Sequence, residues 1–386
     1  MAPPWLEPRT AYIHVPFCGH HCGYCDFAVT AGQDFLIELY LDALEIELQS
    51  LATPRPVESL FIGGGTPTYL NPDQLGRLLE SIRRWLPPQS GTADKLEYSI
   101  ESTPESLDEE KTSLLASFGV SRISVGVQSF RAQRLSALDR RHGVEHISRA
   151  IEAVRHQRLD LSLDLIFAAP GATLDEWQSD LKAAVGFNPD HLSTYGLTYE
   201  KGTPIWKDRA SGRVRPVTED VELAMYEAAI VGLTESGYEQ YEISNFARPG
   251  KRCRHNERYW ANEAYYGFGV GAARYVRGVR ELNVRNTNDY VKRILGGESP
   301  TFQSETLPPR DRAVETMAVQ LRRCDGIERS AFRIQTEYEL DELIGKKLPS
   351  LVSEGLITDD GHRIRLTRRG LCVADGIIES LMAAAG

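Results

Sequence analysis

The sequence lacks a long apolar run. No segment approaches the roughly 20 consecutive apolar residues that are needed to cross a bilayer. The first ten residues, MAPPWLEPRT, also lack the apolar core of a signal peptide. These absences predict a cytoplasmic protein without a transmembrane segment, and they leave peripheral contact with a membrane open.

Positive charge is in deficit as well. Lys and Arg number 44 against 54 Asp and Glu, so the net charge is -10. Broad binding to nucleic acid needs a basic surface, and we therefore expect no nucleic acid among the partners. Hydrophobic residues at 41% and charged residues at 25% are ordinary for a folded protein. A length of 386 residues suggests a large domain plus a smaller one.

Cysteine is scarce, and half of it is clustered. Of six cysteines, Cys18, Cys22 and Cys25 fall within eight positions. This crowding does not resemble the spread framework of a disulfide-stapled secreted domain, so we expect reduced thiols that bind a metal. Cys324 and Cys372 have no partner in sequence and are most simply buried small side chains.

Short β-rich runs alternate with segments of helical length in the first half of the chain. Repeated βα units require a parallel sheet with right-handed crossovers, and six of them can curl into an incomplete barrel whose site lies at the carboxyl ends of the strands. We therefore predict an α/β fold with an incomplete (β/α)6 barrel. The six runs are AYIHV from Ala11, ESLFIGG from Glu58, LEYSIES from Leu96, RISVGVQ from Arg122, LSLDLIFA from Leu161 and HLSTYGLT from His191.

Two helices of this region carry clear local signals. Asn71 followed by Pro72 is typical of a helix start, because Asn caps the first turn and Pro suits its first position. In the preceding helix, spacings of three and four predict one buried stripe, formed by Leu36, Leu39, Tyr40, Ala43 and Leu44.

The pattern changes after about residue 300. Helical segments and one hairpin, LITDDGHRIRLT with its turn at Asp360-Gly361, predict a small winged-helix-like domain. Because the chain is acidic, a lid or docking role is favoured over DNA binding. We predict a barrel domain over residues 1–235, a connecting segment over 236–300 and a C-terminal domain over 301–386.

The clustered thiols suit two kinds of metal centre. Three thiolates in one loop can bind an iron–sulfur cluster, and three ligands for four irons leave one iron open to a substrate. A zinc site would need a fourth ligand, for which His14, His20 and His21 are near in sequence. The spacing alone leaves both readings open.

The blocks around the cysteines resemble a known family. YIHVPFCGHHCGYCDF, FIGGGTPTYL, RISVGVQSF and HLSTYGLTYEKGTP resemble consecutive blocks of the oxygen-independent coproporphyrinogen oxidase group of radical SAM proteins. The resemblance implies a [4Fe-4S] cluster on Cys18, Cys22 and Cys25, with S-adenosylmethionine chelated at the open iron. It also implies an electron donor that reduces the cluster.

The same resemblance implies a wall of residues around S-adenosylmethionine. Glycine backbone would approach the methionine end closely, and Glu101 would accept hydrogen bonds from the ribose hydroxyls. Without the resemblance, the glycine run could be only a turn, Asp164 a structural cap and Arg140 a surface residue. The implied residues are Tyr12, Tyr24, Gly64, Gly65, Thr66, Glu101, Gln128, Arg140 and Asp164.

The residues after the third cysteine separate the chain from the oxidase itself. The oxidase has a further cysteine two residues after the third, where this chain has Asp26-Phe27. CDF and the later RHNERYW instead resemble the HemW-type heme chaperones. In that family the HNxxYW pattern, here His255, Asn256, Tyr259 and Trp260, is associated with heme binding.

Neutral imidazole is a competent axial ligand for heme iron, and aromatic rings can stack on the macrocycle. Cys253 is an alternative thiolate ligand, and Arg252, Arg254 and Arg258 could pair with propionates. Without the resemblance, His255 and Asn256 could equally form a capped turn with the aromatic residues in the core.

The expected function is that of a heme chaperone, which binds heme as cargo and passes it to apo-hemoproteins. The rival is an oxygen-independent coproporphyrinogen III oxidase, which the overall resemblance allows. A third candidate is a radical SAM enzyme that acts on heme itself.

Overall fold

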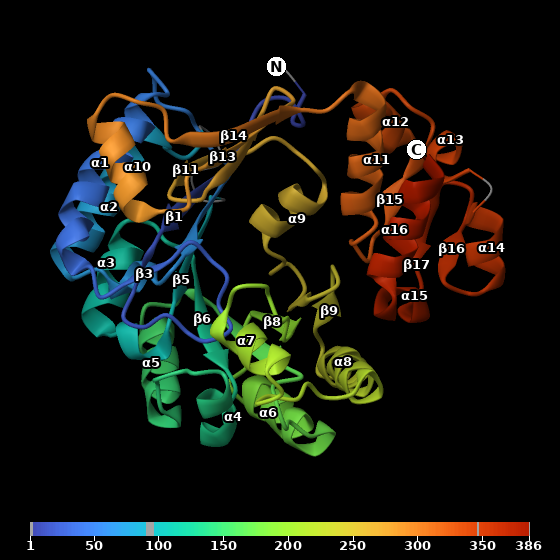
Figure 1. The fold of residues 1–386 in the computed structure, drawn as a ribbon, viewed down its shortest axis with the longest axis horizontal. Helices are drawn as coiled ribbons and strands as arrows, with labels where there is room; N and C mark the ends of the chain where they lie inside the picture. Colours follow the sequence, from blue (N-terminus) through green and yellow to red (C-terminus); the bar gives the residue numbers. More distant parts are fainter. Residues whose placement is uncertain (1–2, 90–95, 346, 386) are drawn as a thin grey trace.

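The computed structural model describes residues 3–89, 96–345 and 347–385. The outer limits of the predicted domains, residues 1 and 386, lie outside this range. The described residues form a nine-stranded main sheet in the order β11-β1-β4-β5-β6-β7-β8-β10-β9. Neighbouring strands from β11 to β8 pair in parallel, whereas β10 pairs antiparallel with both β8 and β9 (Figure 1).

All six predicted strands are present. They are β1 (Thr10–Val15), β4 (Ser59–Gly64), β5 (Glu97–Ser102), β6 (Arg122–Gln128), β7 (Asp160–Phe167) and β8 (His191–Gly196). The sheet is not closed, which confirms the incomplete barrel. A seventh parallel strand, β11 (Tyr266–Gly269), pairs with β1 at the sheet edge and was not predicted. The antiparallel strands are β9 (Glu239–Gln240) and β10 (Asn245–Ala247).

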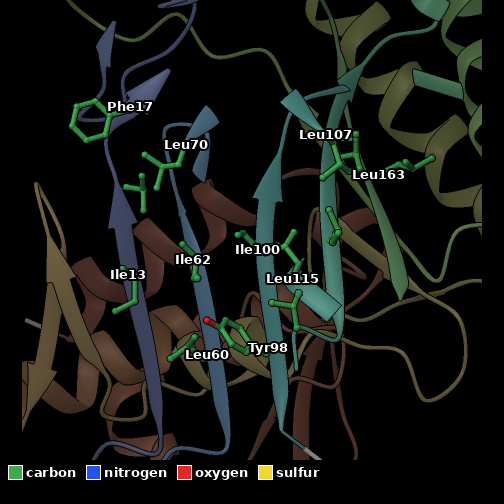
Figure 2. Packing of buried hydrophobic residues seen from close by; sticks show 14 of the residues in the cluster. Ile13, Phe17, Leu60, Ile62, Leu70, Tyr98, Ile100, Leu107, Leu115 and Leu163 are labelled. Carbon is green, nitrogen blue, oxygen red and sulfur yellow. The ribbon is translucent and has the colours of Figure 1, made fainter. Parts of the chain in front are cut away.

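Side chains alternate across the barrel strands. In β1, β4 and β5, Ile13, Ile62 and Ile100 are fully buried and point to the helix side, where Leu115 of α3 (Glu109–Ser117) also packs (Figure 2). The residues between them point the other way, into the barrel. Because a strand has a period of two, one face of each strand forms the core and the other forms the wall of a lumen. In this lumen the wall is rich in polar groups.

The helices of the barrel half follow the strands as expected. They are α1 (Ile37–Gln49), α2 (Pro72–Trp85), α3 (Glu109–Ser117), α4 (Ala132–Ala137), α5 (Val144–His156), α6 (Leu174–Gly186), α7 (Pro204–Ala210) and α8 (Glu219–Glu235). The Asn71 side chain caps α2 by accepting from the Gln74 backbone N–H, and the Gln74 side chain accepts from the Asn71 backbone N–H. This capping box confirms the predicted start of the helix. In the first helix, Tyr40, Ala43 and Leu44 are buried, but Leu39 is 43% exposed. Its place in the predicted stripe was wrong.

The connecting part of the chain adds a second sheet and two helices. The strands β12 (Ala273–Val276), β13 (Val279–Asn283) and β14 (Thr301–Thr306) form an antiparallel sheet. Helix α10 (Thr287–Leu295) packs beside α1, and α9 (Arg254–Trp260) lies between the barrel and the C-terminal helices (Figure 1). The limits of the three predicted domains stay a prediction.

The C-terminal part has its own hydrophobic cluster, centred on Met317, Leu321, Phe332 and Leu381. Strand β15 (Ile327–Glu328) joins the predicted hairpin of β16 (Ile357–Asp359) and β17 (Arg363–Leu366). This sheet and its helices confirm the winged-helix-like character. The helices are α11 (Pro309–Gln320), α12 (Arg329–Thr336), α13 (Leu340–Ile344), α14 (Lys347–Ser353), α15 (Arg368–Cys372) and α16 (Ala374–Ala385).

No helix in the described part of the chain is both long enough and apolar enough to span a membrane.

Candidate functional site

One cavity of about 1130 Å³ fills the barrel lumen. It brings together residues from the first strand to the middle of the chain. Of the residues predicted for the cluster, S-adenosylmethionine and the HNxxYW motif, all but Trp260 line it. The predicted residues in its wall are Cys18, Cys22, Cys25, Tyr12, Tyr24, Gly64, Gly65, Thr66, Glu101, Gln128, Arg140, Asp164, His255, Asn256 and Tyr259.

The three cysteines lie in the loop that follows β1. Cys18 belongs to the short strand β2 (Phe17–Cys18), which pairs with β3 (Thr30–Ala31), and its Sγ lies 3.5 Å from Thr66 Oγ1. Burial raises the pKa of the Cys18 thiol to about 12 and also raises the pKa of Cys25. Metal binding must therefore displace protons from these thiols, and the metal's own charge supplies the driving force.

Arg140 places a positive charge beside the cysteine loop. Its Nη1 donates to Cys22 Sγ at 3.5 Å, and its Nη2 donates to the Gly126 carbonyl at 2.7 Å. Its buried Nε has no partner within the described residues. Arg140 is thus not the surface residue that a reading of its sequence surroundings would allow. It supplies positive charge where thiolates would gather.

The three nearby histidines are engaged elsewhere. His14 contacts Tyr12 Oη through Nδ1 and the Ala28 carbonyl through Nε2, His20 pairs with Asp139, and His21 contacts the Cys25 carbonyl. In the described part of the chain, no three His, Cys, Asp or Glu side chains converge as ligands of one metal ion. A [4Fe-4S] cluster requires its cysteines to lie farther apart than the ligands of one metal ion, because each thiolate binds a different iron.

The glycine run at the end of β4 is required by the protein's own packing. A Cβ on Gly64 would lie 2.5 Å from the His14 ring, and Gly64 has a φ of +107°. A Cβ on Gly65 would lie 2.7 Å from the Phe17 carbonyl oxygen. The close approach of a cofactor to these glycines stays a prediction. These glycines let β4 pass close under the cysteine loop.

Two half-buried carboxyls lie in the wall of the cavity. Burial raises the pKa of Glu101 to about 7, although Oε2 accepts a hydrogen bond from Gly64 N at 2.9 Å. Burial likewise raises the pKa of Asp164 to about 6, against hydrogen bonds from Ser193 and from Ser124 at 3.0 Å. Both groups therefore hold a proton more readily than exposed carboxyls, and a ligand that donates hydrogen bonds would favour their charged forms.

Gln128 ends β6 in an unusual backbone conformation. Its φ is +65°, and the β6–β7 register shifts between Gly126 and Gln128. A left-handed residue other than glycine costs on the order of 1 kcal/mol and is kept only where its surroundings demand it. Here the bend turns the Gln128 side chain into the cavity wall.

Helix α9 closes the opposite end of the lumen. This end, which we call the floor of the barrel, is formed by the first residues of four strands, Thr10, Ser59, Glu97 and Arg122. His255 Nδ1 lies 2.9 Å from Thr10 Oγ1. Since β1 has six residues at about 3.3 Å each, the floor lies on the order of 17 Å from the end of the strand that leads into the cysteine loop.

The His255 ring is enclosed by aromatic groups. Ring centroids lie 4.8 Å away for Tyr259, 5.1 Å for Phe61 and 6.4 Å for Tyr12. Burial, followed by the charge of Arg258, lowers the pKa of His255 to about 3. The imidazole is therefore neutral near pH 7, as a metal ligand must be.

The remaining residues around the motif have different surroundings. Asn256 donates to Tyr241 Oη at 3.3 Å, and Tyr259 stacks on Tyr265 at 4.3 Å. Trp260 lies under the Arg322 guanidinium at 5.3 Å, which places it against the C-terminal part. Arg252 pairs with Asp325, and Arg258 pairs with Glu58 and Glu263, so neither guanidinium faces the cavity.

Several residues of the site were not predicted. Glu97 accepts hydrogen bonds from the backbone N–H groups of Arg254 and His255 at 2.9 and 3.0 Å. The strand pattern held the signal, because the polar residues at alternate positions point into the lumen. Additional polar residues that line it include Ser124, Ser162, Ser193, Arg122 and His191.

Comparison with known proteins agrees with this geometry. Residues 12–184 match the model of the Radical SAM superfamily, and residues 307–373 match that of the HemN C-terminal domain. The solved structure of coproporphyrinogen III oxidase (HemN) from Escherichia coli, described as a radical SAM enzyme, superposes with a TM-score of 0.84. It is 24% identical, and the match covers 97% of this chain and 90% of that one. The fold is therefore that of the radical SAM proteins.

Sequence relatives place the chain more narrowly. The heme chaperone HemW of Bacillus subtilis is 34% identical, with 97% of this chain and 99% of the relative covered. HemW of Escherichia coli is 30% identical, with 98% and 99% covered. The chain belongs to the HemW family of heme chaperones.

Proposed function

We propose that this chain binds heme and delivers it to apo-hemoproteins, and that it carries a [4Fe-4S] cluster and S-adenosylmethionine. The observation that supports this most directly is the shared cavity, whose wall contains the three cysteines at one end and three residues of the HNxxYW motif at the other. Its volume of about 1130 Å³ exceeds the range of about 300–1,000 Å³ that is usual for one small ligand.

The donor set fits the two cofactors of the superfamily. Cys18, Cys22 and Cys25 would hold the cluster beside Arg140, whose charge favours the thiolate forms of Cys18 and Cys25. Glu101 keeps one carboxylate oxygen for the hydroxyls of S-adenosylmethionine, since the other accepts from Gly64. When bound, the reduced cluster can supply an electron to the sulfonium group. The protein orients the cofactor with the set Tyr12, Tyr24, Gly64, Gly65, Thr66, Gln128 and Asp164, which is a proposal from the resemblance.

His255 is a better heme ligand than Cys253. The Cys253 thiol donates to Glu97 Oε1 at 3.4 Å, and burial together with the Glu97 charge raises its pKa. This thiol therefore stays protonated, whereas His255 is neutral and its Nε2 has no partner within the described residues. A neutral imidazole nitrogen with a free lone pair is what heme iron binds.

The rival function is oxygen-independent coproporphyrinogen III oxidation. Phe27 stands where the oxidase resemblance calls for a further cysteine, and its side chain lies 68% exposed at the cavity wall. A phenyl ring offers no thiol to a substrate or metal at that place. The arrangement therefore favours a carrier over this catalyst.

One experiment separates the carrier from the catalyst. The protein is reconstituted anaerobically, titrated with heme by its absorption spectrum, and incubated with coproporphyrinogen III on the same sample. We expect stoichiometric heme uptake and no protoporphyrinogen IX. Turnover of the porphyrinogen would overturn the proposal, and so would the absence of heme uptake.

The ligand is tested with His255→Ala and His255→Gln. Gln keeps a polar side chain at the floor, so it guards against a variant that merely unfolds. We expect both variants to lose axial ligation, and His156→Ala, which changes an exposed histidine, to bind heme normally. An unchanged heme spectrum and stoichiometry in His255→Gln would count against this ligand.

A further inference from the structure

Thr10 is the first residue of β1, and its hydroxyl makes three contacts at the floor of the barrel. Oγ1 lies 2.9 Å from His255 Nδ1, 2.5 Å from Ser59 Oγ and 3.2 Å from the Ser59 carbonyl oxygen. All of these groups are buried. The residues on either side of the hydroxyl are therefore shielded from solvent, and the proton positions must be consistent within the group.

Counting protons gives one consistent arrangement. A hydroxyl has one proton to donate and two lone pairs to accept with. The Ser59 carbonyl can only accept, so the contact at 3.2 Å uses the Thr10 proton. Thr10 Oγ1 then accepts from Ser59 Oγ and from His255 Nδ1. Nδ1 consequently carries the proton, and Nε2 keeps its lone pair.

The opposite tautomer satisfies fewer groups. With the proton on Nε2, Thr10 would have to donate to Nδ1 and would leave the Ser59 carbonyl without this bond. Nε2 has no partner in the described part of the chain in either tautomer, so the two tautomers differ by the bond from Thr10 to the Ser59 carbonyl. One such hydrogen bond contributes about 0.5–1.5 kcal/mol.

We propose that Thr10 is a positioning residue, which keeps the proton of His255 on Nδ1 so that the Nε2 lone pair faces the cavity. The role of that lone pair as a heme ligand rests on the function proposed above. A partner on the far nitrogen of a ligating histidine fixes its tautomer and ring orientation, and losing such a partner typically costs about 10- to 100-fold in metal affinity.

The main chain of α9 supports the same orientation. Glu97 accepts from the backbone N–H of His255 at 3.0 Å and from that of Arg254 at 2.9 Å. The Phe61 and Tyr259 rings, which also line the cavity, lie against the imidazole. The backbone, the ring and Nδ1 of His255 are thus each held by a different group, and Nε2 is the atom left for a ligand.

The first test uses the protein without heme. With 15N-labelled histidine and assignment through His255→Gln, NMR reads the tautomer of His255 in the wild type and in Thr10→Val and Thr10→Ser. We expect the Nδ1–H form in the wild type and in Thr10→Ser, which keeps the hydroxyl, and a mixture or the Nε2–H form in Thr10→Val. An Nε2–H wild type would overturn the proposal, as would a Thr10→Val spectrum that matches the wild type.

The second test measures heme affinity in the same variants. We expect Thr10→Val to bind heme about 10-fold more weakly and Thr10→Ser to bind within about twofold of the wild type. If the tautomers are as proposed but His255→Gln binds heme normally, the heme ligand is wrong while the role of Thr10 stands. If His255→Gln loses heme but Thr10→Val keeps both affinity and tautomer, the role of Thr10 is wrong.

Discussion

Arg140 Nη1 lies 3.5 Å from Cys22 Sγ, although the two residues are separated by 118 positions in the chain. The guanidinium is anchored on its other arm by the Gly126 carbonyl, so its position does not depend on the cysteine. A fixed positive charge beside the cluster ligands stabilises the more negative, reduced form of a cluster.

We therefore predict that Arg140→Met lowers the reduction potential of the reconstituted cluster. The shift should be on the order of tens of millivolts, because the pair is only partly buried and solvent screens its charge. A redox titration followed by electron paramagnetic resonance measures it. Arg140→Lys keeps a charge and should shift less. Equal potentials in Arg140→Met and the wild type would show that the charge does not act on the cluster.

Glu97 should be important for stability, because it holds α9 on the floor of the barrel. Its carboxylate accepts from two backbone N–H groups and lies 3.6 Å from Arg122 Nη1. Glu97→Gln places an amide donor against these donors and leaves Arg122 without its closest carboxylate. We expect a loss of about 2–4 kcal/mol in the free energy of unfolding, measured with urea.

The matched control for that change is Glu38→Gln. Glu38 also pairs with an arginine, Arg77, but its side chain is 60% exposed. The loss should therefore stay below about 1 kcal/mol. Similar losses in both variants would contradict the role of Glu97 in holding α9 on the floor. Unchanged heme affinity in Glu97→Gln would contradict it as well.

Glu101 predicts a pH dependence of stability. Burial raises its pKa from the ordinary value of 4.5 to about 7, so the folded state binds its proton more tightly than the unfolded chain does. This contribution is fully present below about pH 4.5 and is lost as the pH rises through about 7. The full effect is at most about 3 kcal/mol.

Glu101→Gln removes the titrating group and keeps an oxygen that can accept from Gly64. Between about pH 5 and about pH 8, the variant should therefore gain stability relative to the wild type. Urea unfolding at both values, on cofactor-free protein, measures this difference. Parallel pH curves would mean that Glu101 ionises as an exposed carboxyl does.

Trp260, unlike the other residues of the HNxxYW motif, should affect stability rather than heme binding. Its ring contacts Arg322, and the neighbouring Ala261 carbonyl accepts from Gln320 and Gln335 at 3.0 and 2.9 Å. Trp260→Ala should cost about 1–3 kcal/mol of stability by weakening the contact with the C-terminal part. Its heme affinity should stay within about threefold of the wild type, whereas that of His255→Gln should not. A loss of heme binding without a loss of stability would make Trp260 a heme contact after all.

The sequence predicted best the features that depend on nearby residues. Hydrophobic runs located the six strands, and the Asn71-Pro72 pair located the start of α2, because caps and strand cores are set within a few residues. The exposed Leu39 shows the limit of this reasoning. A helical stripe has soft edges, and the neighbouring elements decide which edge residue is covered.

The location of α9 could not be predicted in this way. His255 and Thr10 are 245 positions apart, and Glu97 lies 158 positions from His255. A buried carboxylate at the start of one strand and two backbone donors at the start of a distant helix have no common signal in the sequence. Their contact exists because folding brings unpaired polar groups together at the floor of the barrel.

By itself the sequence determined the barrel strands, the cysteine loop and the family resemblance, since each rests on local spacing. Only the tertiary structure decided that His255 lines the same lumen as the cysteines, that Trp260 faces the C-terminal part, and that Arg140 lies beside the Cys22 thiol. The physical reason is that these relationships depend on which long-range contacts satisfy buried charge and hydrogen bonds, and such contacts follow from the whole fold.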